Sequence, residues 1–176
     1  EDYIRTLPMR SSFLYLAFFY SNFLEYYVPQ RDADGSLTFA IYLPPDVPMP
    51  FVDPLTAAGP AVLEVFDHPE TFAGKSLPVI GEVLTARQMV DTFVRVTGQK
   101  AHYASAYTRE ELLQHFPAFG QNEYLVRELV GMTQYAVEYG YYAPGRDLEW
   151  SRKVDPGALS WELFLRSNQW QGGQVN

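Results

Sequence analysis

The sequence contains no cysteine, only three histidines and no long uninterrupted apolar run. The absence of cysteine excludes a disulfide framework and thiolate chemistry. The longest apolar run, residues 13–20, falls well short of the roughly 20 residues that a membrane-spanning helix needs. We therefore expect no membrane span, and a location in the cytoplasm with the nucleus as a further compartment.

Positive charge is scarce as well. Lysine and arginine total 13 against 21 aspartates and glutamates, which gives a formal net charge of −8. The basic residues are scattered singly, and an acidic surface repels a phosphate backbone. We expect no direct binding to nucleic acid.

Motifs for metal binding and nucleophilic catalysis are also absent. His68, His102 and His115 lie far apart in the sequence, and none belongs to a metal-ligand motif. The neighbours Glu110 and Glu111 diverge around a helix and suit its positive N-terminus, so we interpret them as capping residues. The sequence has no Gly-x-Ser-x-Gly elbow and no P-loop. We therefore assign no catalytic residue and no metal site.

A glycine-rich turn of the form Gly-x-x-Gly-x-x-Gly is missing too. Such a turn lets the backbone approach a pyrophosphate at the N-terminus of a helix. We expect that this chain alone does not bind a nicotinamide dinucleotide tightly.

What the sequence does contain predicts an α/β fold. With 47% hydrophobic and 16% aromatic residues, the 176-residue chain can form the core of one domain or of a large part of one. Residues 11–20 are apolar on both faces, which predicts a buried central parallel strand. A turn at residues 32–35 precedes a second strand at residues 37–43. The proline-rich residues 44–54 predict an ordered irregular loop that lines a cleft.

Helix signals dominate the remainder of the chain. Thr85 with Gln88, and Thr108 with Glu111, have the form of capping boxes, and Ser160 suits the N-cap of a last short helix. The expected helices span residues 55–66, 85–98, 108–116, 123–139 and a short segment after 160, and further strands span 74–80 and 100–104. The long helix should turn one apolar face toward the core, made by Leu125, Leu129, Met132 and Ala136.

The first residues predict a domain that is cut in the middle. Residues 1–5 indicate the last turn of a helix, which leads through Leu7 and Pro8 into the strand at residues 11–20. A helix followed by a strand is the second half of a β-α-β crossover, and the strand and glycine-rich turn that should precede it are not in the sequence. We expect residues 1–176 to be the C-terminal part of a single domain whose dinucleotide-binding N-terminal half is absent.

These residues also carry a family resemblance. The matching positions are Glu1, Tyr3, Ile4, Arg5, Phe19, Asn22, Asp46-Val-Pro-Met49, Gly59-Pro60, Gly74, the helix at 85–98 and Asp155-Pro156. Their order and spacing resemble the C-terminal half of NmrA-like proteins, which are atypical members of the short-chain dehydrogenase superfamily. One departure is Ala57, because the family commonly has an aspartate two residues before the glycine matched by Gly59.

The resemblance implies a Rossmann-type fold, of which this chain would be the substrate-side half with a mostly helical C-terminal lobe. It implies NADP as the cofactor of the complete protein, with the glycine-rich turn and an active-site-like lysine upstream of Glu1. In the family, the segment in which this chain's first predicted strand ends, residues 17–22, lies against the nicotinamide. The candidate cofactor-binding residues are therefore Ala17, Phe18, Phe19 and Asn22. Ordinary core packing and an asparagine helix cap are the alternative.

A substrate-sized pocket is expected beside that segment. Tyr20, Met49 and Phe51 are its candidate lining residues, because apolar walls with a few polar tips are usual in such pockets. Packing in the core is the alternative for each of the three.

The resemblance leaves the function open between three hypotheses. The first is an NADP-binding redox sensor in transcriptional regulation, which engages a protein partner according to the state of the dinucleotide. The alternative is an NAD(P)H-dependent reductase acting on a small carbonyl or quinone, which this part alone would not catalyse. The third is an isolated interaction module that never had a cofactor half.

Two surfaces are candidates for partner binding. An aromatic cluster at and after the end of the long helix is either a docking face or core packing; it consists of Tyr135, Tyr139, Tyr141, Tyr142, Trp150 and Trp161. The edge that should meet the missing half predicts a homo-oligomer or an association with that half.

Overall fold

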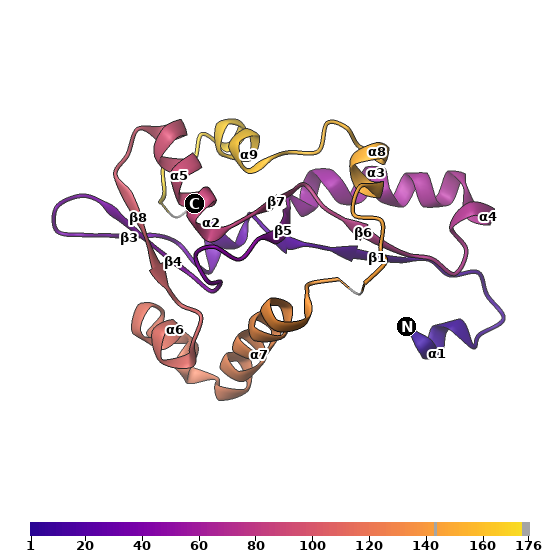
Figure 1. Ribbon diagram of the computed structural model, residues 1–176, viewed down its shortest axis with the longest axis horizontal. Coiled ribbons are helices and arrows are strands. Elements are labelled where there is room, and N and C mark those ends of the chain that lie inside the picture. The colour runs from indigo at the N-terminus through magenta and orange to yellow at the C-terminus, as the bar shows by residue number, and fades with distance from the viewer. Residues whose placement is uncertain (143, 174–176) are drawn as a thin grey trace.

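The computed structural model describes residues 1–142 and 144–173. The chain forms three small sheets surrounded by helices, as the α/β prediction requires. Figure 1 shows an elongated molecule with the N-terminal helix α1 (Asp2–Arg5) near one end and the strand β3 (Gln30–Arg31) near the other.

The predicted first strand is divided between two sheets. Strand β1 (Phe13–Leu16) pairs in parallel with β6 (Ser76–Val79), whereas β2 (Phe18–Phe19) pairs in parallel with β5 (Met49–Val52). The chain therefore changes its neighbour at Ala17, whose N–H still donates to the carbonyl of Val79. A third strand, β7 (Glu82–Leu84), runs antiparallel to β5.

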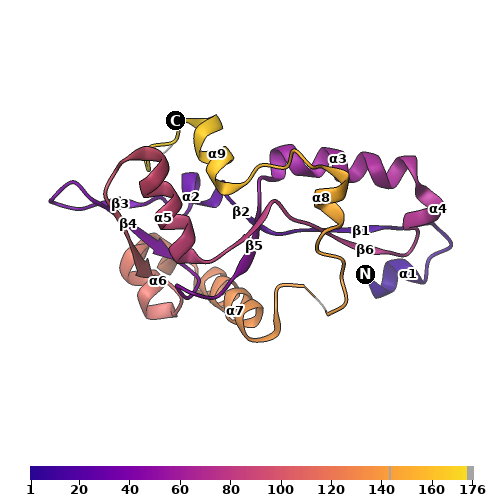
Figure 2. The ribbon, with the colours of Figure 1, turned by 45° about the horizontal axis from the view of Figure 1, so that its top comes forward.

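Burial of this segment differs from the expected uniform burial. Ala17 and Phe18 are buried, but the four residues of β1 are only half-buried. In the part of the chain that the structure describes, β1 has a strand on its β6 side alone, so no strand pairs with its other edge. Helices α3 (Pro54–Asp67) and α8 (Trp150–Val154) lie over one face of the β1–β6 pair (Figure 2).

The prediction of an irregular loop over residues 44–54 is wrong for its second half, which forms β5. Proline in this stretch argued against a strand because proline cannot donate to a ladder. The carbonyl groups of β5 are nevertheless hydrogen-bonded. The carbonyl of Phe51 accepts from the N–H of Gly81 at 2.8 Å, and the carbonyl of Val52 accepts from the N–H of Tyr20 at 3.0 Å.

Helix α3 begins as expected despite the departure at Ala57. Asp53 supplies the N-cap, because its carboxylate accepts from the N–H of Leu55 at 3.4 Å and from the Thr56 hydroxyl at 2.8 Å. Asp53, four residues before Ala57, thus provides the polar contact at the start of α3.

The third sheet lies at the other end of the molecule. Its central strand β4 (Leu37–Ile41) is fully buried between β3 (Gln30–Arg31), which is antiparallel, and β8 (Ala101–Ser105), which is parallel. Helix α5 (Ala86–Thr97) packs on β8 and on α9 (Trp161–Asn168). The predicted capping box of Thr85 and the stop at Gly98, where φ is 73°, are confirmed.

The remaining predicted helices form at their expected positions, but the predicted core face of α7 (Glu123–Tyr139) is wrong in part. Leu125 and Met132 are 38% and 49% exposed and Leu129 is half-buried, whereas the buried residues of this helix are Val126, Thr133 and Ala136. Helix α6 (Arg109–His115) begins with the predicted capping box at Thr108, and α7 (Glu123–Tyr139) has the predicted bounds. The remaining short elements are α2 (Asn22–Glu25), α4 (Pro69–Phe72) and the 3₁₀ helix η1 (Pro117–Gln121). Within residues 1–142 and 144–173, no helix combines the length and hydropathy needed to cross a membrane.

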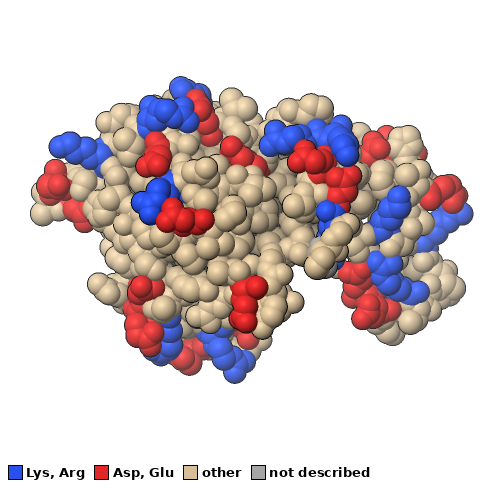
Figure 3. All heavy atoms as spheres, in the orientation of Figure 1, with Lys and Arg blue, Asp and Glu red and all other residues tan. Residues whose placement is uncertain are grey.

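Surface charges are mixed in sign. On the face in Figure 3, basic side chains lie beside acidic ones. The ion pairs of the molecule include Arg87–Asp46 at 2.7 Å and Arg95–Glu162 at 2.8 Å. The same view shows the molecule hollowed between the lobe of α6 and α7 and the end that carries α1.

Candidate functional site

The candidate site is the segment at the carboxyl ends of β1 and β2. Both strands run parallel to their neighbours β6 and β5, so the carboxyl ends of these strands lie at one edge. In α/β sheets this edge is where ligands bind. Backbone hydrogen bonds from Ala17 to Val79 at 3.1 Å and from Tyr20 to Val52 at 3.0 Å hold the segment in place.

The four candidate cofactor residues differ in what they can offer a ligand. Ala17 is buried, so only its backbone is available near this edge. Phe18 is buried against the rings of Tyr42 and Tyr141, with centroid separations of 5.3 and 4.6 Å. The side chain of Phe19 is 37% exposed, and Asn22 is half-buried at the start of α2. Phe19 and Asn22 are therefore the accessible members of the set.

A cavity of about 330 Å³, which we call the aromatic cavity, lies beside this segment. It is lined by Phe18, Asn22, Tyr26, Tyr27, Tyr42, Phe119, Leu125, Leu129 and Met132. These residues come from β2, α2, the end of β4, η1 and α7, so elements far apart in sequence build its walls. Two of the four candidate cofactor residues, Phe18 and Asn22, therefore belong to a cavity wall.

The candidate substrate-pocket residues lie elsewhere. Tyr20 packs in the core against Trp161 and Phe164, with centroid separations of 5.3 Å to each. Phe51 is also fully buried, and neither Tyr20 nor Phe51 is among the described residues that line the aromatic cavity. Met49 is buried too, but it borders an open depression of about 440 Å³ near the end of α7. For Tyr20 and Phe51, the structure shows the core packing that the sequence left as the alternative.

Two tyrosine hydroxyls in this region are buried without a hydrogen-bond partner among the described residues. They belong to Tyr20 and Tyr42. Burial raises the pKa of Tyr20, with the charge of Glu82 as a smaller cause. Burial also raises the pKa of Tyr42; the side chain of Asn22 acts in the opposite direction, but no hydrogen bond of normal geometry joins the two groups. Both phenols are therefore neutral hydrogen-bond donors at physiological pH.

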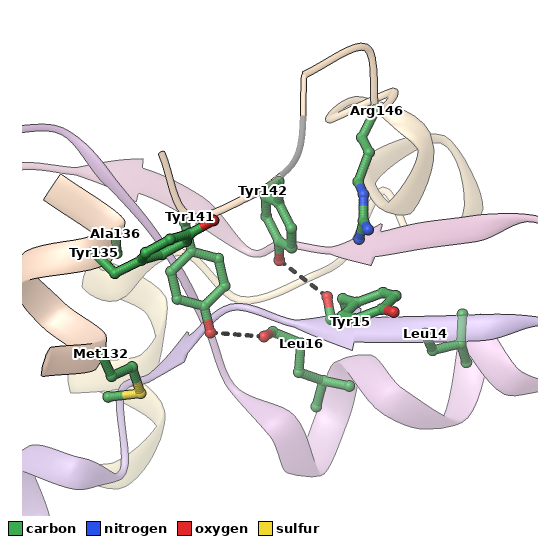
Figure 4. A pocket seen from close by; sticks show the side chains of 9 residues that line it. All are labelled: Leu14, Tyr15, Leu16, Met132, Tyr135, Ala136, Tyr141, Tyr142 and Arg146. Carbon is green, nitrogen blue, oxygen red and sulfur yellow. Dashed lines mark hydrogen bonds between the residues drawn. The ribbon is translucent and has the colours of Figure 1, made fainter. Parts of the chain in front are cut away.

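A second, more open cavity of about 410 Å³ lies between β1 and the end of α7 (Figure 4). The hydroxyl of Tyr141 donates to the carbonyl of Leu16 at 3.0 Å, and that of Tyr142 donates to the carbonyl of Tyr15 at 3.0 Å. The guanidinium of Arg146 lies 4.2 Å from the centre of the Tyr15 ring. Tyr141 and Tyr142 thus fasten the segment after α7 to β1.

Replacing both Tyr141 and Tyr142 by phenylalanine should lower the melting temperature. Each hydroxyl donates one hydrogen bond to β1, worth about 0.5–1.5 kcal/mol, and ~1 kcal/mol shifts a domain of this size by ~2–4 °C. Thermal denaturation followed by circular dichroism measures the change. The double variant Tyr135→Phe with Tyr139→Phe is the matched control. Equal melting temperatures for the two double variants would contradict the conclusion that the hydroxyls of Tyr141 and Tyr142 fasten the chain to β1.

The aromatic cluster at and after the end of α7 therefore has three parts, of which Tyr141 and Tyr142 form the one that fastens to β1. Tyr135 and Tyr139 are each 63% exposed, and their ring centroids lie 4.9 Å apart. Trp150 and Trp161 are buried, so they belong to the core. A docking surface in this cluster would be the exposed pair on α7.

The polar clusters show structural roles. The carboxylate of Glu111 accepts from the Thr108 N–H at 2.9 Å, and this backbone hydrogen bond is the main cause of its lowered pKa. His68 lies 3.8 Å from Glu64, one helical turn earlier. In the described ranges, 1–142 and 144–173, no three potential metal ligands come together.

The sequence did not reveal the walls of the aromatic cavity. Tyr26 and Tyr27 lie one helical turn after Asn22, so the sequence could indicate that these three residues are close, but nothing local joins them to Tyr42 or Phe119. The apolar face of α7 was predicted from its spacing, yet that spacing does not distinguish core from cavity wall. Leu129 and its neighbours on this face line the cavity.

The fold and the edge site together define an α/β protein of the Rossmann type. Residues 1–165 match the NmrA-like family, and the chain belongs to this family. It is 32% identical over 108 residues to the nitrogen metabolite repression protein nmrA of Emericella nidulans, covering 58% of this chain and 31% of that protein. It is 30% identical over 110 residues to an NmrA-like family domain-containing protein of Dictyostelium discoideum, covering 58% of this chain and 36% of that protein.

A solved structure of NmrA, a negative transcriptional regulator, in complex with NADP has the same fold. The TM-score is 0.69 at 20% sequence identity, with 94% of this chain and 54% of that chain covered. The alignments thus span about a third of the two curated relatives and just over half of the solved structure.

Proposed function

We propose that this chain forms the nicotinamide-side wall of a larger NmrA-like, NADP-binding regulatory protein that senses the state of its dinucleotide. The observation that carries the proposal is the edge segment, residues 17–22, where the side chain of Phe19 is 37% exposed and Asn22 lines the aromatic cavity. The complex of NmrA with NADP, and the coverage of only 54% of that chain, support it.

The residues present fit one end of the dinucleotide. An exposed aromatic ring at Phe19 and an amide at Asn22 suit a nicotinamide ring with its carboxamide. The printed sequence has no glycine-rich turn that would suit the pyrophosphate. When bound, NADP would supply a hydride acceptor, and NADPH a hydride donor.

Variants of the two accessible residues test the proposal in the longer protein that it requires. Asn22→Ala and Phe19→Ala should each weaken NADPH binding about two- to tenfold, because each removes one contact worth about 0.5–1.5 kcal/mol. Isothermal titration calorimetry measures the dissociation constants. Tyr124→Ala, an exposed aromatic change on α7, is the control, and affinities that match wild type in both site variants would defeat the proposal.

A second candidate function is that of a reductase for a small carbonyl or quinone. The aromatic cavity favours it, because Phe18 and Asn22 line a space beside the proposed nicotinamide position. This chain provides no assigned catalytic residue, so the proton donor would come from the other part of the protein. Detection of an intact Tyr-x-x-x-Lys in that part favours the reductase, and its loss favours the sensor.

Partner binding and location follow from the regulatory proposal. The exposed pair Tyr135 and Tyr139 is the proposed docking surface for a protein partner, because tyrosine combines apolar area with a polar tip. A regulator of this kind would act in the cytoplasm and also in the nucleus.

We expect this chain to oligomerise when it is isolated. Beside the open edge of β1, the outer face of α3 exposes Leu55, Leu63 and Phe66, with exposed fractions of 89%, 60% and 75%. Exposed apolar patches and free strand edges drive association. Multi-angle light scattering should report a mass above 20.1 kDa, whereas a stable monomer that does not bind a hydrophobic dye would contradict the expectation.

A further inference from the structure

The described lining of the aromatic cavity carries no charge. Five of its nine residues are aromatic, three are aliphatic or sulfur-containing, and one is Asn22. The whole chain has a formal net charge of −8, so the uncharged lining is a local property of this cavity. A charged ligand would leave water here and find no ion partner in the described wall, which is costly. The lining therefore favours a ligand without charge.

The aromatic rings of the lining contact one another in a continuous arc. The ring of Tyr42 contacts those of Phe18 and Tyr27, with centroid separations of 5.3 and 4.5 Å. The ring of Tyr27 in turn lies 5.8 Å from that of Phe119. Because Phe18, Tyr27 and Tyr42 are buried in the core, the surrounding packing fixes their positions. A ligand would therefore find these rings already in place, which lowers the entropic cost of binding.

Ring contacts, not a polar group, dominate what this wall offers. The hydroxyl of Tyr42 is sealed from solvent beside the side chain of Asn22, so a ligand does not depend on it. Apart from Asn22, the nitrogen and oxygen atoms in the side chains of the described lining are tyrosine hydroxyls, and each tyrosine is apolar over most of its surface. The main attraction for a ligand is burial of apolar area against aromatic rings.

The cavity has a closed inner wall and an open mouth. Phe18, Tyr27 and Tyr42 are buried, and they form the inner wall. Tyr26 and Met132 are exposed at the rim, so the mouth opens to solvent between α2 and α7. The volume of about 330 Å³ is at the lower end of the ~300–1,000 Å³ that is usual for small-molecule sites. This size suits a compact molecule of one or two rings, whereas a partner helix, about 10–12 Å wide with its side chains, does not fit inside.

We propose that the aromatic cavity binds a small, uncharged, planar aromatic molecule of one or two fused rings, held by ring contacts and apolar burial. The proposal deepens the proposed function by naming a ligand class for the space beside the proposed nicotinamide position. It rests on that function only for the second role of Phe18 and Asn22. Binding of the aromatic molecule requires no dinucleotide, so the two proposals can fail separately.

Three probes separate planarity from charge and from apolar area. 2-Naphthol is planar and uncharged at neutral pH, decahydro-2-naphthol has the same carbon skeleton but is saturated, and 2-naphthoate is planar but charged. Each is titrated into the 176-residue chain without dinucleotide, and binding is followed by ligand-observed NMR. 2-Naphthol should bind about two- to tenfold more tightly than its saturated analogue, because aromatic pairs attract beyond the area they bury. 2-Naphthoate should bind at least about tenfold more weakly than 2-naphthol.

Phe119→Leu removes one ring from the cavity wall and keeps an apolar side chain. It should reduce the preference for 2-naphthol over decahydro-2-naphthol at least about twofold. Phe116→Leu is the matched control, because the rings of Phe116 and Phe119 both pack on Tyr27, at 5.3 and 5.8 Å, but Phe116 is not among the cavity-lining residues. Phe116→Leu should leave the preference intact, and both variants should lower the melting temperature by similar amounts.

A second pair of variants tests the location. Met132→Trp should fill the mouth and weaken binding of 2-naphthol at least about tenfold, whereas Glu128→Trp on an exposed position of the same helix should not. Equal affinity of the wild-type chain for the planar and saturated probes, tighter binding of the charged probe, no binding of 2-naphthol, or an unchanged preference in Phe119→Leu would overturn the inference. NADPH binding in the longer protein is a separate measurement, and its failure would leave this result standing.

Discussion

NADPH titrated into this chain alone should give no saturable signal below about 1 mM. A dissociation constant of 1 mM corresponds to about −4.1 kcal/mol. In the proposed placement, this chain would contact only the nicotinamide end of the dinucleotide, through the segment at residues 17–22. Most of the anchoring in a Rossmann site comes from the pyrophosphate at a glycine-rich helix N-terminus, and the printed sequence lacks that turn. The expected loss relative to a protein that carries the turn is at least two to three orders of magnitude.

Fluorescence of NADPH is the direct measurement, because the reduced nicotinamide responds to transfer from water into a binding site. The control is the longer protein with its glycine-rich turn, measured under the same conditions. Saturable binding by the isolated chain at micromolar concentration would mean that it contains a dinucleotide site of another kind.

Ser151→Ala should cause the largest loss of stability among single substitutions considered for this chain. The buried hydroxyl of Ser151 accepts from the N–H of Ile80 at 2.9 Å and donates to the carbonyl of Ile80 at 3.1 Å. Removing it leaves both buried backbone groups without these partners, at about 1–3 kcal/mol each. The total of about 2–6 kcal/mol predicts a fall in melting temperature of at least ~4 °C.

The matched control is Ser167→Ala. Its hydroxyl donates to the carbonyl of Leu163 at 2.8 Å, but the site is exposed, so water replaces the lost bond. Thermal denaturation of the two variants should separate them clearly. If they melt within about 1 °C of each other, Ser151 does not join α8 to the end of β6.

Local signals explain which elements were predictable. The capping boxes at Thr85 and Thr108 act over three residues, and the 3.6-residue period of α7 needs no distant partner. Each of these elements forms where the sequence indicated it.

Strand pairing depends on distant residues, and there the sequence was less informative. The apolar run over residues 11–20 did not reveal that Ala17 is the point where the chain leaves β6 for β5. In the same way, the prolines of residues 44–54 obscured β5, whose stability comes from bonds to Tyr20 and Gly81.

The sequence named the residues of the candidate site, but it did not reveal most of the residues that surround them. Phe18 belongs to β2 and Asn22 follows that strand, both residues line the aromatic cavity, and their use by a cofactor stays a prediction. Side-chain alternation in a short strand could not tell that Phe19 faces out while Tyr20 enters the core. The cavity walls depended on contacts across β4, η1 and α7, which no local pattern encodes.

The account rests on residues 17–22 facing the nicotinamide, and hydrogen–deuterium exchange of the longer protein tests this most directly. On saturation with NADPH, amides in residues 17–22 should exchange more slowly, while those of α3, on the far side of the β1–β6 pair from α7, should keep their rates. Slower exchange at residues 17–22 supports the cofactor-facing wall. Unchanged exchange there, with NADPH demonstrably bound, would contradict it.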